Sequence, residues 1–335
     1  MIICRTPFRI SFFGGGTDFP HWYKKNGGAV ISSTIDKYCF SIVRNLPPIF
    51  DYKYRLRYFQ NEFAKNKNSI KHKSIYAVLK KYHKRDTPLE IVHNADLPAL
   101  SGLGASSAFT VSLINSIKSL NDKSKLSKKI LAESAIEIEQ EILNEYVGSQ
   151  DQYSCAYGGL NYIKFSKNKI NVKNIAISKN KINELQQNII LFFTGIQRKA
   201  QIIEKDKLNN LDKNYNNLIK INSIVNEAKK IFFSKKNFDL ILLSELLNES
   251  WILKKSLSRK VTNSKLDEIF EVGIRSGALA GKILGAGGGG FIMFLTPNNK
   301  IKEKIKNNLK KLTSINIKFD IEGSKIIHKS YNDNF

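Results

Sequence analysis

The segment Ser101–Ala108, which reads Ser-Gly-Leu-Gly-Ala-Ser-Ser-Ala, constrains the fold of this chain more than any other feature. Gly102 and Gly104 allow the backbone to approach a ligand closely. Apolar residues recur at helical spacing over 109–120, so the segment is a loop that opens a helix. Free N–H groups and the positive end of the helix dipole converge at such a point, which predicts a phosphate cradle. A plain helix start, with Ser106 only as the N-cap, is also compatible with this pattern.

A second glycine-rich run, Gly285–Gly290, matches the letters G-x-G-x-x-G of dinucleotide-binding folds. That motif needs a strand before the turn and a helix after it. Here a helical pattern over 263–284 comes first and a strand pattern over 291–295 follows, so we reject a Rossmann site. The glycine content instead predicts that the backbone of this run lies in close contact with another group, because glycine has no side chain to keep that group away. The loop 101–108 is not a Walker A motif, because no Gly-Lys-Ser or Gly-Lys-Thr follows it, and Gly277–Lys282 also fails that template, in its spacing and in the following Ile283.

Helical and strand patterns alternate along the 335 residues, which predicts an α+β fold of about two domains. The predicted strands cover 2–13, 29–35, 38–44, 89–93, 158–163, 189–194 and 291–295. The predicted helices cover 70–82, 109–120, 128–146, 210–232, 240–254 and 263–284. The stretch 166–180 shows only a weak alternation of Lys, Asn and Ile. We place the domain boundary near its end, which gives domains of 1–180 and 181–335.

The chain carries 54 Lys and Arg against 29 Asp and Glu, a formal charge of +25. This charge favours anionic partners, and nucleic-acid binding is therefore the alternative class of function. The basic residues are not grouped with aromatics in an RNA-binding motif, and stretches such as 207–230 are typical of solvated faces. Cys4, Cys39 and Cys155 have neither disulfide-framework nor zinc-site spacing, and no apolar run approaches about 18 residues. We therefore predict a cytoplasmic protein.

Two acidic residues, Glu139 and Asp151, lie at either end of a predicted helix and turn. A kinase that phosphorylates a hydroxyl needs a carboxylate to orient or deprotonate that group, a Mg²⁺ ligand, and a cation near the transferred phosphoryl group. This region can supply both acids. A glutamate on a charged helix is also compatible with a solvated face.

Taken in order, these pieces resemble the GHMP small-molecule kinase superfamily over nearly the whole chain. Its three motifs match residues 6–18, 98–107 and 282–290. The resemblance implies a two-domain fold, with an N-terminal ribosomal-S5-like β/α domain and a C-terminal ferredoxin-like α+β domain. It also implies a kinase that uses ATP and Mg²⁺ on a small molecule, without nucleic-acid or membrane partners, as a monomer or homodimer.

The resemblance assigns roles to individual residues. It implies that the nucleotide phosphates lie over Ser101, Gly102, Leu103, Gly104, Ala105, Ser106 and Ser107. Ser107 and Glu139 would be the Mg²⁺ ligands. Asp151 would face the acceptor hydroxyl, as a general base or as an orienting acceptor, and Arg9 would neutralise charge beside it.

Within the superfamily, the turn Gly14–Asp18 and the segments 148–153, 251–263 and 277–291 look most like the kinases of D-glycero-D-manno-heptose 7-phosphate. These enzymes phosphorylate the anomeric 1-hydroxyl, in the synthesis of nucleotide-activated heptose for bacterial surface polysaccharide. Asp18 would hold sugar hydroxyls, with Gly15, Gly16 and Thr17 around it. Galactokinases carry Glu-His in place of Gly15-Gly16, so a wider pocket is expected here. An unphosphorylated sugar such as fucose, mannose or galactose is the alternative substrate.

The distal phosphate of such a sugar needs a cation that the nucleotide does not already use. Arg198 is our first choice, because a planar guanidinium suits bidentate phosphate binding; a solvated surface cation is the alternative. The other candidates are Lys199, Lys254, Lys255, Lys24 and Lys25. Lys282 is expected either in the wall behind the phosphate loop or in a structural ion pair.

Overall fold

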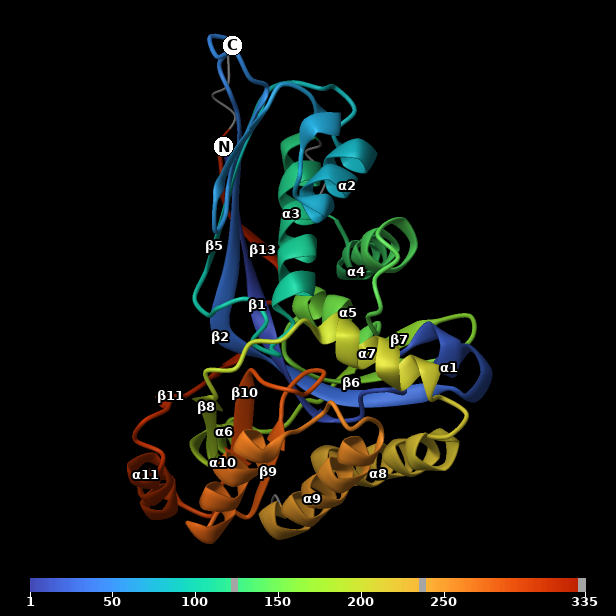
Figure 1. The fold of residues 1–335 in the computed structure, drawn as a ribbon, viewed down its shortest axis with the longest axis vertical. Coiled ribbons are helices and arrows are strands. Elements are labelled where there is room, and N and C mark those ends of the chain that lie inside the picture. The colour runs from blue at the N-terminus through green and yellow to red at the C-terminus, as the bar shows by residue number, and fades with distance from the viewer. Residues whose placement is uncertain (122–125, 235–238, 331–335) are drawn as a thin grey trace.

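The strands of the protein form two sheets (Figure 1). The structure is a computed structural model that describes residues 1–121, 126–234 and 239–330. The larger sheet has the order β13–β1–β2–β5–β3–β4, and in addition β6 and β12 pair with β2 and β7 pairs with β6. Its pairs are antiparallel except for β3 with β5. Its strands are β1 (Ile2–Phe13), β2 (Gly28–Asn45), β3 (Tyr54–Arg57), β4 (Asn61–Ala64), β5 (Leu89–Ala95), β6 (Leu160–Phe165), β7 (Ile170–Asn174), β12 (Phe319–Asp320) and β13 (Lys325–Lys329).

Strand β2 replaces the two strands predicted over 29–35 and 38–44, so that prediction of a break was wrong. Its first half pairs with β6 and its second half with β5, while β1 pairs along both halves. At the expected turn, the N–H of Asp36 donates to the carbonyl of Lys318 at 2.8 Å. The chain therefore does not turn at the polar residues in the middle of β2, because they form hydrogen bonds with the segment around Lys318.

The helices of the N-terminal half lie along one side of the long strands in Figure 1. Helix α3 packs on β1 and β2, and α2, α4 and α5 pack around α3. Most side chains of α3 are buried, which fits its content of apolar and small residues. The bounds are α1 (Pro20–Asn26), the short 3₁₀ turn η1 (Lys67–Ser69), α2 (Lys73–Tyr82), α3 (Ala105–Asn121), α4 (Lys128–Ile136), a π-helical turn η2 (Glu137–Ile142) and α5 (Gln150–Tyr157).

The smaller sheet is antiparallel, with the order β11–β8–β10–β9. Its strands are β8 (Ile189–Phe193), β9 (Ala280–Ile283), β10 (Phe291–Leu295) and β11 (Thr313–Ile315). The helices of this half are α6 (Lys179–Gln187), α7 (Ala200–Asn209), α8 (Tyr215–Phe233), α9 (Leu240–Ser256), α10 (Ser264–Arg275) and α11 (Asn299–Asn308). Helices separate β8 from β9 and β10 from β11, and this arrangement confirms the predicted ferredoxin-like α+β half.

The helix predicted over 263–284 is wrong in its second half. Helix α10 ends at Arg275, Gly277 adopts a φ of 109°, and β9 follows. A side chain at Gly281 would lie 2.8 Å from the Phe294 ring, so this glycine allows β9 to pack closely against the aromatic core. The glycine run Gly285–Gly290 therefore joins two strands of a hairpin. It still opens no helix, so the rejection of a Rossmann site stands.

The smaller sheet is buried on both faces. Alternate residues of β8 and β10 contribute to two separate apolar clusters, as period-two side-chain alternation requires. One cluster continues into the core of the larger sheet, so both halves share apolar packing. Strands β12 and β13 come from the end of the chain but pair with β2 and β1. The boundary near residue 180 stays a prediction.

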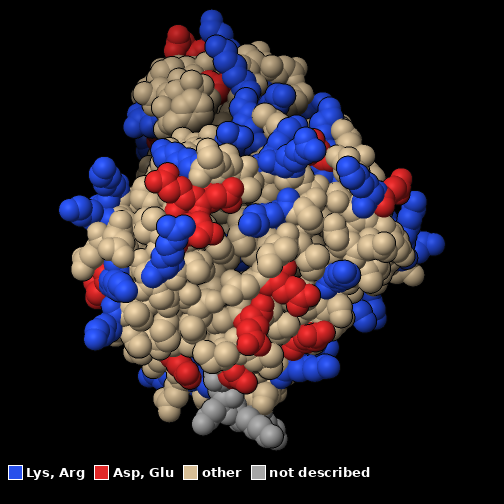
Figure 2. All heavy atoms as spheres, turned by 60° about the horizontal axis from the view of Figure 1, so that its bottom comes forward, with Lys and Arg blue, Asp and Glu red and all other residues tan. Residues whose placement is uncertain are grey.

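The excess of basic residues does not form one patch on the face drawn in Figure 2. Lys and Arg are spread over this face, with groups of acidic side chains between them. Across the described ranges, we find no helix with the length and apolarity that crossing a membrane would require.

Candidate active site

A cavity of about 350 Å³ lies where the two halves meet. From the N-terminal half it is lined by residues of β1, the turn 14–16, the loop 101–107 and α5. From the C-terminal half it is lined by residues of α7, α9 and the glycine run. This volume falls within the range that holds a small ligand. The cavity therefore collects, from distant parts of the chain, most of the residues that the sequence singled out.

The loop 101–107 forms one wall of this cavity and leads into α3. Gly102 and Gly104 adopt φ values of 80° and 75°, which glycine tolerates without strain. A side chain at Gly104 would lie 3.2 Å from Oδ2 of Asp151, so the glycine lets the loop approach that carboxylate. Leu103 departs from the expected contact: its side chain is buried in the core and does not line the cavity.

The glycine run lies directly behind this loop. A side chain at Gly285 would lie 2.6 Å from the Cα of Gly102, and one at Gly290 would lie 2.2 Å from the carbonyl oxygen of Ser101. The N–H of Phe291 donates to that same carbonyl at 3.0 Å. Backbone packs against backbone here, which explains the glycine content of the run.

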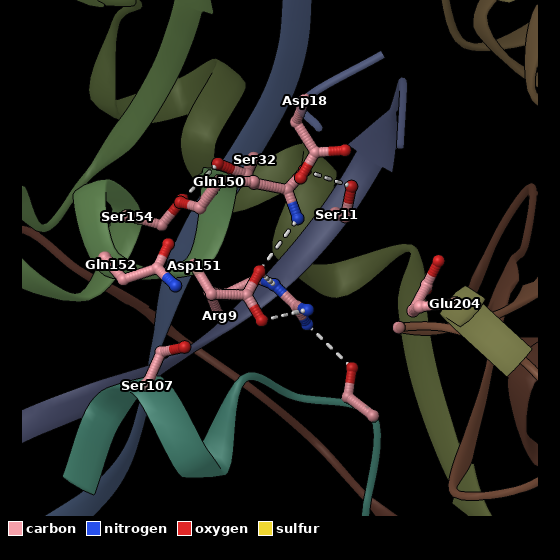
Figure 3. A network of polar contacts seen from close by, with 12 residues as sticks. Arg9, Ser11, Asp18, Ser32, Ser107, Gln150, Asp151, Gln152, Ser154 and Glu204 are labelled. Carbon is pink, nitrogen blue, oxygen red and sulfur yellow. Dashed lines mark hydrogen bonds and ion pairs between the residues drawn. The ribbon is translucent and has the colours of Figure 1, made fainter. Parts of the chain in front are cut away.

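Arg9 and Asp151 both line the cavity and form a bidentate ion pair (Figure 3). Nε and Nη2 of Arg9 each donate to one carboxylate oxygen of Asp151 at 2.7 Å. Nη1 of Arg9 donates to the carbonyl of Gly102 at 2.6 Å, which ties the pair to the loop. Gln150 donates to Asp151 at 3.2 Å and accepts from Ser11. The Asp151 side chain is 24% exposed, so its carboxylate is held in place and still open to the cavity.

Glu139 is buried on the π-helical turn η2, where one continuous helix over 128–146 had been predicted. This prediction was wrong, because the wider turn interrupts the helix, and π-helical turns are frequent at functional sites. Ser107 Oγ donates to Glu139 Oε2 at 2.8 Å, and Gln152 Nε2 donates to the same oxygen at 2.5 Å.

The second oxygen of Glu139, Oε1, is buried and has no hydrogen-bond partner in the part of the chain that the structure describes. Burial raises the pKa of this carboxyl to about 7. A buried carboxylate oxygen without a partner, next to a serine hydroxyl, fits the hard oxygen ligands that Mg²⁺ prefers. Ser107 and Glu139 are therefore suited to hold the metal.

Asp18 is buried under the turn 14–16 and lines the cavity. Its Oδ1 accepts the N–H of Gly16 at 2.9 Å. Burial, followed by the charges of Asp151 and Glu204, raises the pKa of Asp18 to about 6. A side chain at Gly15 would contact nothing within 4 Å, so the turn leaves open space beside Asp18. Thr17 points elsewhere: it is fully buried, and its hydroxyl donates to the carbonyl of Ala29.

The candidate cations divide into two groups. Arg198 and Lys254 line the cavity. The candidates that do not line it are Lys199, Lys255, Lys24 and Lys25. The ion pair expected as one alternative for Lys282 is not found among the described residues, and Lys282 does not line the cavity. This residue is buried, has no carboxylate within 4 Å among the described residues, and donates to the carbonyl of Phe12 at 2.7 Å. Burial and then the charge of Arg9 lower its pKa to about 7.

Several polar residues of the site were not identified from the sequence, and Gln152, Glu204 and Lys207 are among them. Gln152 follows Asp151 directly and lies in the segment 148–153 that carries the resemblance, but no role was assigned to it. Glu204 and Lys207 belong to a lysine-rich stretch, whose residue types are those of a solvent-exposed helix. Their place in the cavity depends on how α7 packs against the N-terminal half.

Two family models match the chain, the GHMP kinases N-terminal domain over residues 69–159 and the GHMP kinases C-terminal domain over residues 233–314. The D-glycero-alpha-D-manno-heptose 7-phosphate kinase of Campylobacter jejuni is 34% identical over 311 residues, which cover 90% of this chain and 91% of that protein. The chain belongs to the GHMP kinase family. More particularly, it is a sugar kinase: an ATP-dependent phosphotransferase that acts on a sugar hydroxyl.

Two further similarities are more distant. The crystal structure of a D-glycero-D-manno-heptose 1-phosphate kinase from Bacteroides thetaiotaomicron superposes with a TM-score of 0.81 at 22% identity, covering 99% of this chain and all of that one. This likeness shows the fold alone. The bifunctional fucokinase/GDP-fucose pyrophosphorylase of Arabidopsis thaliana is 24% identical over 341 residues, which are 93% of this chain and 31% of that protein.

Proposed function

We propose that this sugar kinase transfers the γ-phosphoryl group of ATP to the anomeric 1-hydroxyl of D-glycero-D-manno-heptose 7-phosphate and forms the 1,7-bisphosphate. The Arg9–Asp151 ion pair, exposed to a cavity beside the loop 101–107, is the observation that carries the reaction. The 34% identity to a heptose 7-phosphate kinase supports the choice of sugar. The reaction would contribute to nucleotide-activated heptose for bacterial surface polysaccharide.

Each residue has a place in this reaction. Asp151 accepts the proton of the 1-hydroxyl or orients that group. The hydroxyl oxygen then bonds to the γ-phosphorus, the bond between the γ-phosphorus and the bridging oxygen breaks, and ADP leaves. Arg9 is fixed to Asp151 and to the loop, so its charge lies where negative charge develops on the transferred group. Asp18 accepts hydroxyl hydrogens of the sugar.

The nucleotide phosphates lie over the loop 101–107, at the N-terminus of α3. Ser107 and Glu139 would hold Mg²⁺, which when bound would offset the charge of the phosphates. Glu139 is buried and its pKa is raised to about 7, so it must give up any proton it carries before it can ligate the metal.

An unphosphorylated sugar is the alternative acceptor, supported by the similarity to a fucokinase. The test is a coupled ADP-release assay across heptose 7-phosphate, mannose, fucose, galactose and mevalonate, followed by ³¹P NMR of the product. We expect the highest kcat/KM with heptose 7-phosphate and a new phosphorus resonance coupled to the anomeric proton. A higher kcat/KM with an unphosphorylated sugar, or a new phosphate at another carbon, would refute the proposal.

A further inference from the structure

Lys254 on α9 is a buried cation that faces the cavity. Only 8% of the residue is exposed, yet it lines the cavity wall. Its Nζ donates to the carbonyl of Ile283 at 3.0 Å and to that of Gly285 at 2.5 Å. An ammonium group carries three N–H donors, so one remains for a ligand.

Among the described residues, Lys254 has no ion-pair partner of its own: the carboxylate that acts on it, Glu204, is paired with Lys207. Within the described residues, no carboxylate lies within 4 Å of its Nζ, so it forms no ion pair there. Burial, and then the nearby charges of Lys282 and Lys207, lower its pKa well below the usual value. A buried charge without a counter-ion is costly, and an anionic ligand would offset that cost.

Lys207 on α7 lies close to Lys254 and also lines the cavity. Its Nζ donates to the carbonyl of Ala286 at 2.8 Å and to Glu204 at 3.1 Å. Glu204 in turn lies near enough to Asp18 to raise the pKa of that residue. The two lysines therefore lie on the side of the cavity where Asp18 would hold sugar hydroxyls. The nucleotide phosphates are expected over the loop 101–107, where they have partners of their own, and the glycine run packs behind that loop.

From this geometry we infer that Lys254, assisted by Lys207, binds the phosphate group that the sugar already carries and that does not react. This inference rests on the proposed function, because it assumes a phosphorylated sugar as the acceptor. The substrate's phosphate supplies the counter-ion that the protein lacks at Lys254. The neutral hydroxyl of an unphosphorylated sugar leaves the buried ammonium without a counter-ion, so the site discriminates against such sugars.

The same contacts link the sugar's phosphate to the nucleotide side. Lys254 and Lys207 hold consecutive carbonyls of the glycine run, at Gly285 and Ala286, and this run lies directly behind the loop 101–107. Lys254 is therefore both a ligand of the sugar phosphate and a support for the glycine run. The test must separate these two roles.

We compare kcat/KM for D-glycero-D-manno-heptose 7-phosphate and for the unphosphorylated heptose, at saturating ATP, in the wild type and in Lys254→Met. The ratio of the two values should fall about 10- to 150-fold, because a charge-assisted hydrogen bond is lost for only one of the two sugars. Lys255→Met is the matched control, because Lys255 is the next residue on α9 and lies over the Trp251 ring, outside the cavity. The control should keep the wild-type ratio.

Equal losses on both sugars in Lys254→Met would mean that Lys254 only supports the glycine run, and would overturn the inference. An unchanged ratio with unchanged rates would overturn it too. A wild-type preference for the unphosphorylated sugar would refute both the proposed function and this inference. The experiment therefore distinguishes a failure of the proposed function from a failure of the inference. The sugar preference of the wild type tests the proposed function, and the ratio in Lys254→Met tests the phosphate subsite.

A measurement on the wild type covers the case in which Lys254→Met does not fold. Inorganic phosphite, a small dianion, should raise the turnover of the unphosphorylated heptose, because it can occupy the subsite that the missing phosphate leaves open. Lys254→Gln, which keeps N–H donors but lacks the charge, should respond less to phosphite than the wild type. No activation of the wild type by phosphite would contradict the inference.

Discussion

Two buried cations in the walls of the cavity, Arg9 and Lys254, have opposite surroundings. In the N-terminal wall, Arg9 is paired with Asp151 at two contacts of 2.7 Å, and the buried Glu139 is held by a serine and a glutamine. In the C-terminal wall, Lys254 is held by main-chain carbonyls without a carboxylate within 4 Å in the described part of the chain. In our proposal, the Arg9–Asp151 pair serves chemistry that is the same for any acceptor hydroxyl, and Lys254 selects an anionic substrate.

The largest effect is expected from Asp151→Asn in the N-terminal wall. It should lower kcat about 10²- to 10⁴-fold on every sugar, because the carboxylate that receives or orients the hydroxyl is lost. ATP affinity should change little, since the loop 101–107 is intact. Steady-state kinetics and nucleotide binding by calorimetry measure the two quantities. Glu133→Gln, at an exposed position on α4, is the control. Wild-type turnover in Asp151→Asn would remove this residue from the mechanism.

Glu139→Ala and Ser107→Ala should raise the Mg²⁺ concentration for half-maximal activity roughly tenfold or more, because each removes an oxygen ligand. Binding of Mn²⁺ in the presence of ADP, followed by electron paramagnetic resonance, gives a readout that does not depend on turnover. Glu137→Gln is a matched control on the same π-helical turn, since Glu137 is partly exposed and paired with Lys81. If neither variant changes metal binding, the metal lies elsewhere.

Asp18→Asn should make the protein more stable and a poorer enzyme. The pKa of Asp18 is raised to about 6 in the folded state, from the ordinary 3.8, so the ionised carboxylate opposes folding above pH 6. Removing its charge should increase the free energy of unfolding at pH 7 by at most about 3 kcal/mol. This value follows because the pKa rises from 3.8 to about 6 and a difference of one in pKa corresponds to about 1.4 kcal/mol. This gain should decline as the pH falls from 6 to 4.

Urea unfolding of both proteins at pH 7 and pH 4 measures the stability gain of Asp18→Asn, and the KM for the sugar measures its cost. The sugar KM should rise, because an amide accepts fewer hydroxyl hydrogens than a carboxylate. A loss of stability in Asp18→Asn at pH 7 would show that the ionised carboxylate is better stabilised in the fold than its burial implies.

The smallest effect is expected from Arg198→Ala, at the rim of the C-terminal wall. Arg198 lines the cavity but is exposed, and solvent and salt screen such a charge. The KM for heptose 7-phosphate should rise about two- to fivefold, and the KM for the unphosphorylated sugar should not change. Lys199→Ala, outside the cavity, is the control. Equal changes for both sugars would exclude contact between Arg198 and the phosphate.

The N-terminal wall could be predicted from the sequence in more detail than the C-terminal wall. Its glycines, serines and Asp151 lie in short contiguous motifs, in which local spacing carries the chemistry. Even so, the sequence did not predict the π-helical turn at Glu139, because a helical pattern does not show where one extra residue widens a turn. The direction of the Thr17 side chain, toward Ala29, was equally inaccessible.

The C-terminal wall depends on packing between distant segments. Lys207 and Lys254 come from two helices, and nothing in their neighbouring residues marks them as buried. The small residues of β9 suit a helix as well as a strand, and its pairing with β10, a contact between segments that spacing does not show, makes it a strand. Burial of a lysine is a property of the whole fold, and residue spacing does not predict it.

One ratio tests most directly whether Asp151 serves the reaction and Lys254 serves substrate selection. It is kcat/KM for heptose 7-phosphate divided by kcat/KM for unphosphorylated heptose, measured in Asp151→Asn and Lys254→Met under identical conditions. We expect Asp151→Asn to lose rate on both sugars and to keep the wild-type ratio. We expect Lys254→Met to lower the ratio at least tenfold. A ratio that falls in Asp151→Asn, or one that is unchanged in Lys254→Met, would contradict the account.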